Sequence, residues 1–298
     1  MSEDPVSLFD AIPDAPSYSE AELRDCEHAG DFRPILFEHY KFVAQLCVLV
    51  SCLKVESPLW AGRQRRTWEV ISGLFSRCYR LMSANLEFFQ HGKYAEASYI
   101  IDRCILESAA KIRWIAQDKS DERATRFVQG SLKPELELFE KIQSNIADRG
   151  DTLVIETRML SSIQNTFDVS GVTKSQISGL KKLPDLYSIL NDIGETRLTY
   201  TIMGKIASHH VHGSWVSLLD SYLKSENGLF EPNHATLASR SPQYVFLPLF
   251  VLSAAQDYIS HCFSASEQTN YLAELFLSSA EDIRKIGQVD SEEDFNIS

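Results

Sequence analysis

Apolar residues recur every three or four positions along most of the chain, which is the spacing of helices that bury one face. No run alternates apolar and polar residues over a useful length, so we expect neither strands nor a β-hairpin. The pattern predicts helices over these stretches: 19–28, 34–54, 63–90, 94–117, 124–147, 153–167, 184–193, 194–212, 213–223, 242–264 and 266–286. The predicted fold class is therefore all-α, an antiparallel helical bundle with additional flanking helices.

The two ends of the chain differ from its middle in composition. Three prolines stand among Asp, Ser and Glu near the start, so we expect residues 1–31 to form an extended, partly disordered lead-in. We expect residues 32–286 to form a single helical-bundle domain and residues 287–298 to form a disordered acidic tail. Within the domain, the stretches 168–182 and 225–241 show only weak helical spacing of apolar residues, so we expect loops there. We expect the first of them to be a mobile loop or lid.

Charge and apolar run length exclude two classes of partner. The 298 residues carry a formal net charge of −12, and a surface this acidic repels a polyanion, so we expect no extended DNA-binding surface. The longest apolar runs, 42–53 and 244–255, are much shorter than the ~20 residues of a membrane helix. The acidic start lacks a secretory signal, and the six cysteines form no CxxC pair. These features predict a cytoplasmic protein without a membrane partner.

Polar residues line one side of the predicted helix over 194–212. Successive residues of a helix turn by about 100°, which places five of them on one stripe: Arg197, Thr201, Lys205, Ser208 and His212. Beside this stripe lie the apolar residues Leu198, Ile202, Met203 and Ile206. A polar stripe next to a buried face predicts a cavity or a close helix contact.

Arg103 and Glu107 form the second candidate group, one turn apart on the predicted helix over 94–117. Apolar residues cover two faces of that helix, so we expect it to be central. Arg103 is suited to bind a phosphate or carboxylate, with Glu107 fixing its rotamer. The alternative is a buried bridge that fixes the register of two helices.

Histidine supplies the candidate proton-transfer group. Histidine side chains gain and lose a proton near neutral pH, so His212 is a candidate general acid or base, and Ser208, one turn earlier, would orient it or act as the nucleophile. The alternative is that His212 caps the carbonyl groups at the end of its helix, before Gly213. His209 and His212 could share a cation, but neither short-spaced Cys ligands nor a Glu-x-x-His pair accompanies them, so we expect no metal and no cofactor.

Two motifs carry a resemblance to a known family. The first is R-x-x-x-E, formed by Arg103 and Glu107; the second is Y-x7-S-x3-H-G. Their members and flanking residues are Gly92, Arg103, Glu107, Trp114, Tyr200, Ser208, His212 and Gly213. Over roughly residues 34–223 the chain resembles the mainly bacterial, all-helical domain-of-unknown-function family DUF5677. The resemblance implies that Arg103, Glu107, Tyr200, Ser208 and His212 belong to one shared site or one shared structural lock.

A more distant similarity is to nucleotide-binding helical (HEPN-like) domains, many of which are toxin or defence ribonucleases in which four to six residues separate an Arg from a following His. Lys205 stands at that distance before His210 and His212. A lysine lacks the two-pronged phosphate contact of a guanidinium. To supply that contact, Arg197 or Arg103 would have to lie beside the histidine in the folded protein.

Two functions follow from these residues. The first is a protein with a polar pocket between the Arg103 and His212 helices, which binds or cleaves a phosphate-bearing ligand, either a nucleotide or RNA. Its catalytic residues would be His212, Ser208 and Glu107, acting as a metal-independent ribonuclease or other phosphodiester hydrolase. Its ligand-binding residues would be Arg103, Arg197, Lys205, Tyr200 and Thr201. The second is a non-catalytic interaction or adaptor protein in which the same residues are structural. The sequence does not decide whether this protein forms a homodimer.

Overall fold

The computed structural model describes residues 12–91, 93–177, 180, 182–226, 228–237 and 241–294. Helices dominate this part of the chain, which confirms the all-α prediction. Two compact units can be distinguished: Met1–Lys119 with Leu186–Ser298, and Ser120–Asp185. Each unit is described by itself, and the single domain expected over 32–286 stays a prediction.

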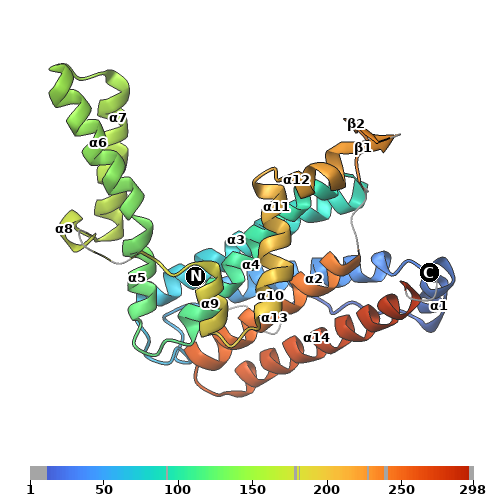
Figure 1. The fold of residues 1–298 in the computed structure, drawn as a ribbon. Helices are drawn as coiled ribbons and strands as arrows, with labels where there is room; N and C mark the ends of the chain where they lie inside the picture. The colour runs from blue at the N-terminus through green and yellow to red at the C-terminus, as the bar shows by residue number, and fades with distance from the viewer. Residues whose placement is uncertain are drawn as a thin grey trace, which may run out of the picture. The chain divides into compact units, whose positions relative to one another are not determined.

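Five long helices form the bundle of the first unit. They are α2 (Arg33–Ser51), α3 (Arg65–His91), α4 (Ala95–Ala116), α13 (Ser241–Cys262) and α14 (Glu267–Asp294). α3 packs along α2 and α4, and α13 packs along α2, α4 and α14 (Figure 1). Tyr40, Phe75, Ile105 and Tyr258 are fully buried between them. α14 continues past Ile286, where the sequence placed the end of the last helix, and residues 295–298 lie outside the described residues.

The lead-in contains the short helix that the sequence predicts, α1 (Glu20–Ala29). It begins with a capping box. The Glu22 N–H donates to Ser19 Oγ at 3.2 Å, and the Ser19 N–H donates to the Glu22 carboxylate at 2.7 Å. Two N–H groups that would otherwise lack a partner at the helix start are thus satisfied, which defines where the helix begins.

Arg63 joins the ends of two helices that are far apart in the sequence. Its guanidinium donates to the carbonyl oxygens of Ala116 at 3.0 Å and Asp118 at 2.6 Å, beyond the end of α4. It also donates to the carbonyl of His261 at 3.2 Å, at the end of α13. The last carbonyls of a helix have no partner within it and carry partial negative charge, so one cation stabilises both ends.

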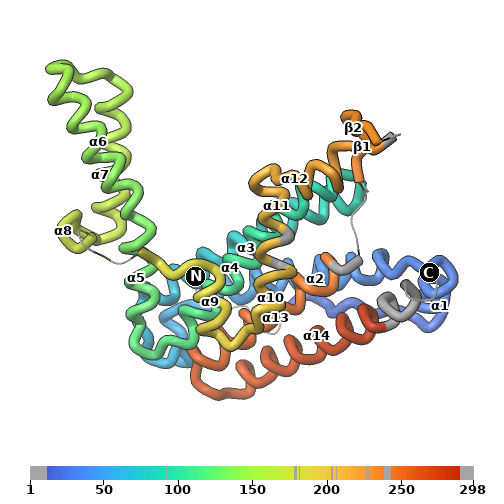
Figure 2. Tube along the Cα trace, viewed as in Figure 1, coloured from blue at the N-terminus to red at the C-terminus, as the bar shows by residue number. Residues whose placement is uncertain are grey.

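The predicted helix over 194–212 is not a regular α-helix. It consists of α10 (Arg197–Thr199), the π-helix η2 (Tyr200–Ile206) and α11 (Ala207–Val211), and it follows α9 (Leu186–Asp192) (Figure 2). α12 (Trp215–Ser217) and the π-helix η3 (Leu218–Tyr222) continue the chain. A π-helix has more residues per turn than an α-helix, so the 100° rotation assumed for the polar stripe is wrong across 200–206.

The expectation of no hairpin was wrong. Strands β1 (Leu223–Glu226) and β2 (Leu229–Pro232) pair in antiparallel orientation, from the end of the helix expected over 213–223 into the loop expected over 225–241. The sequence signal is the dipeptide at 227–228, Asn followed by Gly, which favours a two-residue hairpin turn. Gly228 has a φ of +79°, which glycine adopts without strain. Asn227 lies outside the described residues.

The second unit consists of α5 (Glu122–Ser131), α6 (Lys133–Arg149), α7 (Val154–Ser170) and α8 (Lys174–Ile177). Its own core contains Leu136, Ile142, Ile163 and Phe167. At the α6–α7 turn, an ion pair joins Arg149 to Glu156. α7 and α8 occupy part of the stretch 168–182 that was expected to be a mobile loop, and Ser178, Gly179 and Lys181 lie outside the described residues.

Across the described residues, none of the helices combines the length and the apolar character needed to cross a membrane. Four cysteines (Cys26, Cys47, Cys78 and Cys262) are buried. Burial raises the pKa of the Cys78 thiol to about 12, so it behaves as a small apolar side chain.

Candidate functional site

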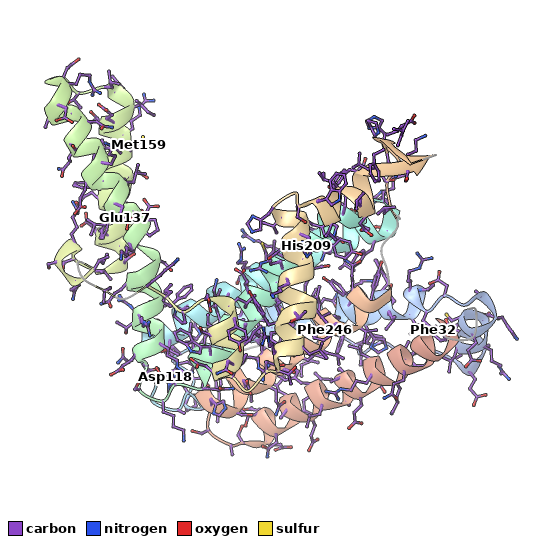
Figure 3. The ribbon with its side chains drawn as sticks, in the orientation of Figure 1. Phe32, Asp118, Glu137, Met159, His209 and Phe246 are labelled. Carbon is purple, nitrogen blue, oxygen red and sulfur yellow. The ribbon has the colours of Figure 1, made fainter. Side chains whose placement is uncertain are left out.

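The two groups of predicted site residues meet where α4 contacts η2 and α11. The ring of Tyr99 on α4 stacks on His210 of α11, with 4.5 Å between ring centroids. One turn later on α4, Arg103 reaches earlier positions of the other segment, Gly204 and Ser208. The two segments are therefore antiparallel, and Figure 3 shows α11 with His209 labelled on it.

Arg103 is the centre of this contact. Its Nη1 donates to Ser208 Oγ at 2.6 Å and to the Gly204 carbonyl, and its Nε donates to Glu107 Oε1 at 3.1 Å. The other Glu107 oxygen lies 3.7 Å from Lys111 Nζ. The Arg103 side chain is 20% exposed and that of Glu107 34%, so water reaches both groups only in part. The Glu107 contact restrains the Arg103 side chain, and the guanidinium links η2 and α11 to α4.

The π-helix explains which stripe residues take part. Gly204 is buried and Ser208 is half-buried on the α4 side. By contrast, four residues expected beside them are exposed to solvent: Arg197, Thr201, Lys205 and His212. The structure thus brings Arg103, Glu107 and Ser208 together, and it leaves these four on the outer surface.

Tyr200 packs within η2. Its ring lies edge-on to that of Tyr187, with centroids 5.2 Å apart. A Cβ added to Gly204 would lie 2.9 Å from Tyr200 Cδ2, which is closer than real Cβ contacts. The family motif's tyrosine therefore covers the glycine whose carbonyl accepts from Arg103, and its ring has a packing role.

The three neighbouring histidines have different environments. His209 Nδ1 lies 2.8 Å from Ser214 Oγ, His210 stacks on Tyr99, and His212 is exposed at the end of α11. The His212 backbone N–H donates to the Ser208 carbonyl at 3.0 Å, which is an ordinary hydrogen bond of the last helical turn, and capping by the His212 side chain stays a prediction. Within the part of the chain that the structure describes, no group of three or more His, Cys, Asp or Glu side chains could hold a metal ion.

Trp114, the remaining described motif residue of α4, ties that helix to α9. Its Nε1 donates to Asp192 Oδ2 at 3.1 Å. The preceding residue, Arg113, forms an ion pair with Glu195 and donates from Nε to Asp257 Oδ2 at 2.9 Å. Burial alone would lower the pKa of Arg113, but the two carboxylates raise it. Gly92, which the resemblance also uses, lies outside the described residues.

Asp102 is a buried carboxyl group that the sequence reasoning missed. Asn85 Nδ2 donates to its Oδ1 at 2.6 Å, and Gln243 Nε2 donates to its Oδ2 at 2.6 Å. Asn85 Nδ2 also reaches Tyr40 Oη at 3.2 Å, and Gln243 Nε2 reaches Ser98 Oγ at 2.9 Å. Burial raises the Asp102 pKa to about 7, and the two amide donors offset part of this effect.

A sequence signal for this network exists. Asp102 lies four residues after Ser98 and three before Ile105, so it interrupts a face of its helix that is otherwise buried. A charged residue on such a face is buried only with hydrogen-bond partners. The partners of Asp102 come from α3 and α13, and the sequence does not indicate which residues of those helices face it.

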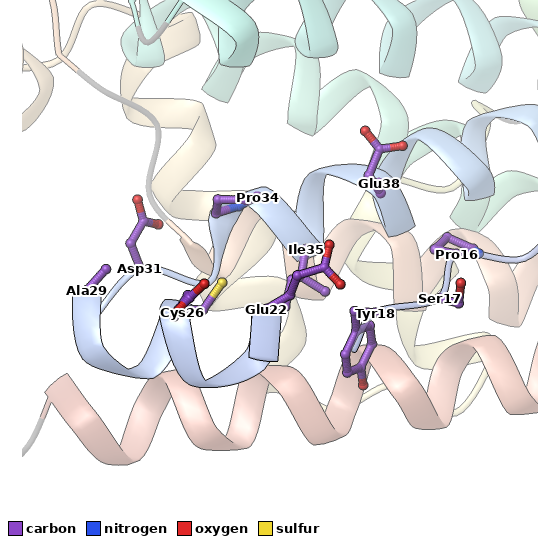
Figure 4. Close-up of a pocket in the computed structure, with 11 residues that line it drawn as sticks. Pro16, Ser17, Tyr18, Glu22, Cys26, Ala29, Asp31, Pro34, Ile35 and Glu38 are labelled. Atoms are coloured by element: carbon purple, nitrogen blue, oxygen red, sulfur yellow. The ribbon is translucent and has the colours of Figure 1, made fainter. Parts of the chain in front are cut away.

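The described cavities lie elsewhere. One of 390 Å³ lies between α1 and α2 and is lined by Tyr18, Glu22, Asp25, Asp31, Ile35 and Glu38, among others (Figure 4). Another, in the second unit, is lined by α6 and α8. None of the predicted site residues lines either cavity. At the position of the expected pocket, Arg103 and Ser208 are in direct contact.

Comparison with known proteins identifies the family. No curated protein and no solved structure matches the chain, so neither comparison supports the expected similarity to nucleotide-binding helical domains. The model of DUF5677, a family of unknown function, matches residues 69–230. This match begins later than the expected resemblance over 34–223, yet it spans more than half of the 298 residues and includes both motifs. The chain therefore belongs to the DUF5677 family.

Proposed function

We propose that this protein is a non-catalytic interaction protein. The observation that carries the proposal is that the Arg103 guanidinium already donates to Glu107, the Gly204 carbonyl and Ser208. Two of these three partners belong to the helical segment opposite α4. The motif residues then act as a lock, and their function is to fix that segment.

A phosphate ligand would have to compete with this lock. Hydrogen bonds to a charged group contribute about 1.5–3 kcal/mol each, and a ligand that took Arg103 from Ser208 would also leave the Gly204 carbonyl with one donor fewer. The other cations of the expected site, Arg197 and Lys205, are exposed to solvent, whereas Arg103 is only partly exposed. The lock interpretation therefore needs no rearrangement, whereas the ligand interpretation needs one.

The locked segment presents apolar side chains to solvent. We call residues 197–232 the platform; it comprises α10, η2, α11, α12, η3 and the hairpin. Its exposed large apolar residues are Leu198, Ile202, Val211, Trp215, Val216, Leu219, Tyr222, Leu229 and Phe230. Trp215 is 55% exposed although it is the largest of them. An apolar surface of this kind on a folded protein favours an interaction role.

The charge of the platform indicates the chemistry of its partner. Residues 197–232 contain three basic and three acidic residues, so their formal charge is 3 − 3 = 0, whereas the whole chain carries −12. Charged residues are depleted at the centres of protein interfaces, where aromatic residues are enriched. The partner is therefore a protein with an apolar, charge-balanced surface.

The first test separates a lock from a ligand site. Arg103→Ala is expected to lower the free energy of unfolding by about 2 kcal/mol because Ser208 and Glu107 lose their partner. Arg80→Ala, at an exposed position of α3, is the matched control and should change stability by less than about 0.5 kcal/mol. Chemical denaturation measures both. Inorganic phosphate and a 5′-phosphorylated RNA should give no heat of binding in calorimetry.

The catalytic alternative makes the opposite prediction. In it, Arg103 and Lys205 bind the phosphate group and His212 transfers a proton. Binding or cleavage of the RNA by the unmodified protein, lost in His212→Ala without loss of stability, would overturn the proposal.

The second test addresses the platform itself. A photoreactive phenylalanine analogue at Val216, 56% exposed, should crosslink in cells to a discrete protein, and Trp215→Asp should abolish the crosslink. The same analogue at Val169, which is 81% exposed in the second unit, is the control. Equal crosslinking at both positions, or none at Val216, would contradict the proposed interaction role.

A further inference from the structure

We infer that the partner of the platform is a second copy of this chain, docked in antiparallel orientation about a twofold axis. The inference rests on the proposed function, since it names the partner of the same surface. In a twofold contact each copy uses the same patch, so the patch must be complementary to itself.

The charges of the platform meet this condition. Arg197 and Lys205 are exposed at its beginning, and residues 197–219 contain no acidic residue, so this half carries +2. Residues 220–232 contain three acidic residues and one lysine, so that half carries −2. When two copies lie antiparallel, the positive half of each faces the negative half of the other. Parallel stacking would instead place like charges together.

The apolar residues fit the centre of such a contact. Trp215 lies between the two charged halves in the sequence, and its ring packs edge-on against Phe230 with centroids 5.4 Å apart. Both rings remain more than half exposed. Large, partly fixed aromatic side chains of this kind dominate binding energy when a partner covers them.

The hairpin limits how the two copies can join. Lys224 stands in β1, and Pro232, which has no N–H to donate, ends β2. Lysine and proline on edge strands disfavour the addition of further strands. The copies therefore meet through side chains of the platform, and the contact closes as a dimer without extending into a fibre.

Analytical ultracentrifugation of the full-length protein tests the inference. The unmodified chain should sediment as a dimer at micromolar concentration, and Trp215→Asp should raise the dimer dissociation constant at least about tenfold. Val169→Asp, an equally non-conservative change at an exposed position of the second unit, should leave the constant unchanged. A monomer at all concentrations, or a dimer that Trp215→Asp does not weaken, would refute the inference.

A charge exchange tests the orientation. The variant Arg197→Glu/Lys205→Glu makes both halves negative, and Asp220→Lys/Glu231→Lys makes both halves positive. Each variant alone should be monomeric, and a mixture of the two should restore a dimer that contains one copy of each. Circular dichroism checks that both variants remain folded. If the mixture stays monomeric while the unmodified protein dimerises, the antiparallel arrangement is wrong.

These outcomes separate the inference from the function on which it rests. A purified monomer whose Val216 analogue still crosslinks to another protein in cells would refute self-association and leave the interaction role standing. A purified monomer with no crosslink at Val216 would refute both.

Discussion

Asp102 shows how the surroundings of one residue set its chemistry. The carboxyl group is 8% exposed, and it accepts hydrogen bonds from the neutral amides of Asn85 and Gln243. No cation contributes to its pKa, which burial raises to about 7. The group therefore gains a proton near neutral pH. Asn85 Oδ1 has no hydrogen-bond partner among the described residues, so after rotation of the amide this oxygen could accept a hydrogen bond from the protonated Asp102 carboxyl.

Asp102→Asn should remove a pH dependence of stability. An Asp in the unfolded chain has a pKa of ~3.9, so the folded state binds this proton more tightly. Its contribution to stability is complete below about pH 4 and is lost as the pH rises through about 7. At 1.36 kcal/mol per pKa unit, the loss is at most roughly 4 kcal/mol. Urea denaturation from acidic to neutral pH should give a flatter curve for the variant.

The control for this experiment is Asp25→Asn, at an exposed position of α1. It should leave the slope of stability against pH as it is in the unmodified protein. If Asp102→Asn also leaves that slope unchanged, the Asp102 carboxyl is not the group that titrates.

At the scale of elements, the π-helix η2 decides which motif residues meet. Its wider turn places the Gly204 carbonyl and Ser208 beside Arg103, while Lys205 faces solvent. Single-turn π segments are rare and costly, and they persist where other contacts compensate. Here the Tyr200 ring covers Gly204, and the Arg103 guanidinium donates hydrogen bonds to Glu107, the Gly204 carbonyl and Ser208, so η2 is stabilised from both sides.

Gly204→Ala should destabilise this element. The new Cβ would lie 2.9 Å from Tyr200 Cδ2 and 3.5 Å from Leu186 Cδ2, so the tyrosine must move, at a cost of about 1–3 kcal/mol. Gly73→Ala is the matched control, because nothing lies within 4 Å of a Cβ there. In that exposed position of α3, alanine should stabilise by about 0.5–1 kcal/mol. Urea denaturation measures both values.

A second change tests the cause. Tyr200→Ala together with Gly204→Ala should cost less than the sum of the two single changes, because the clash disappears with the ring. Additive costs would show that the Tyr200 ring is not what excludes a side chain at position 204.

At the scale of the whole molecule, the chain forms two units with separate cores. The core of the second unit contains Ile163 and Phe167, and the first unit buries Phe75 and Tyr258 among its long helices. The second unit is an insertion between α4 and α9 of the first, so the first unit is discontinuous in sequence. Each core gains its stability from its own apolar contacts.

Phe167→Ala should therefore act on one unit. Loss of a buried phenylalanine costs about 3–5 kcal/mol, and hydrogen exchange should show reduced protection within 120–185 alone. Phe75→Ala, a matched change in the first unit, should reduce protection in 12–119 and 186–294. Reduced protection across the whole chain in both variants would mean that the two units unfold together.

The sequence by itself determined the helical class, the positions of most helices and the Arg103–Glu107 pair, because helical periodicity and one-turn spacing are local properties. It also contains the Asn-Gly dipeptide at 227–228, which favours the hairpin turn. Only the tertiary structure decided the π-helix, the partners of Asp102 and the contacts of Arg103 with Gly204 and Ser208. These contacts join residues far apart in the sequence, such as Arg103 with Ser208 or Asp102 with Gln243. Local spacing cannot indicate contacts that form only when distant helices pack.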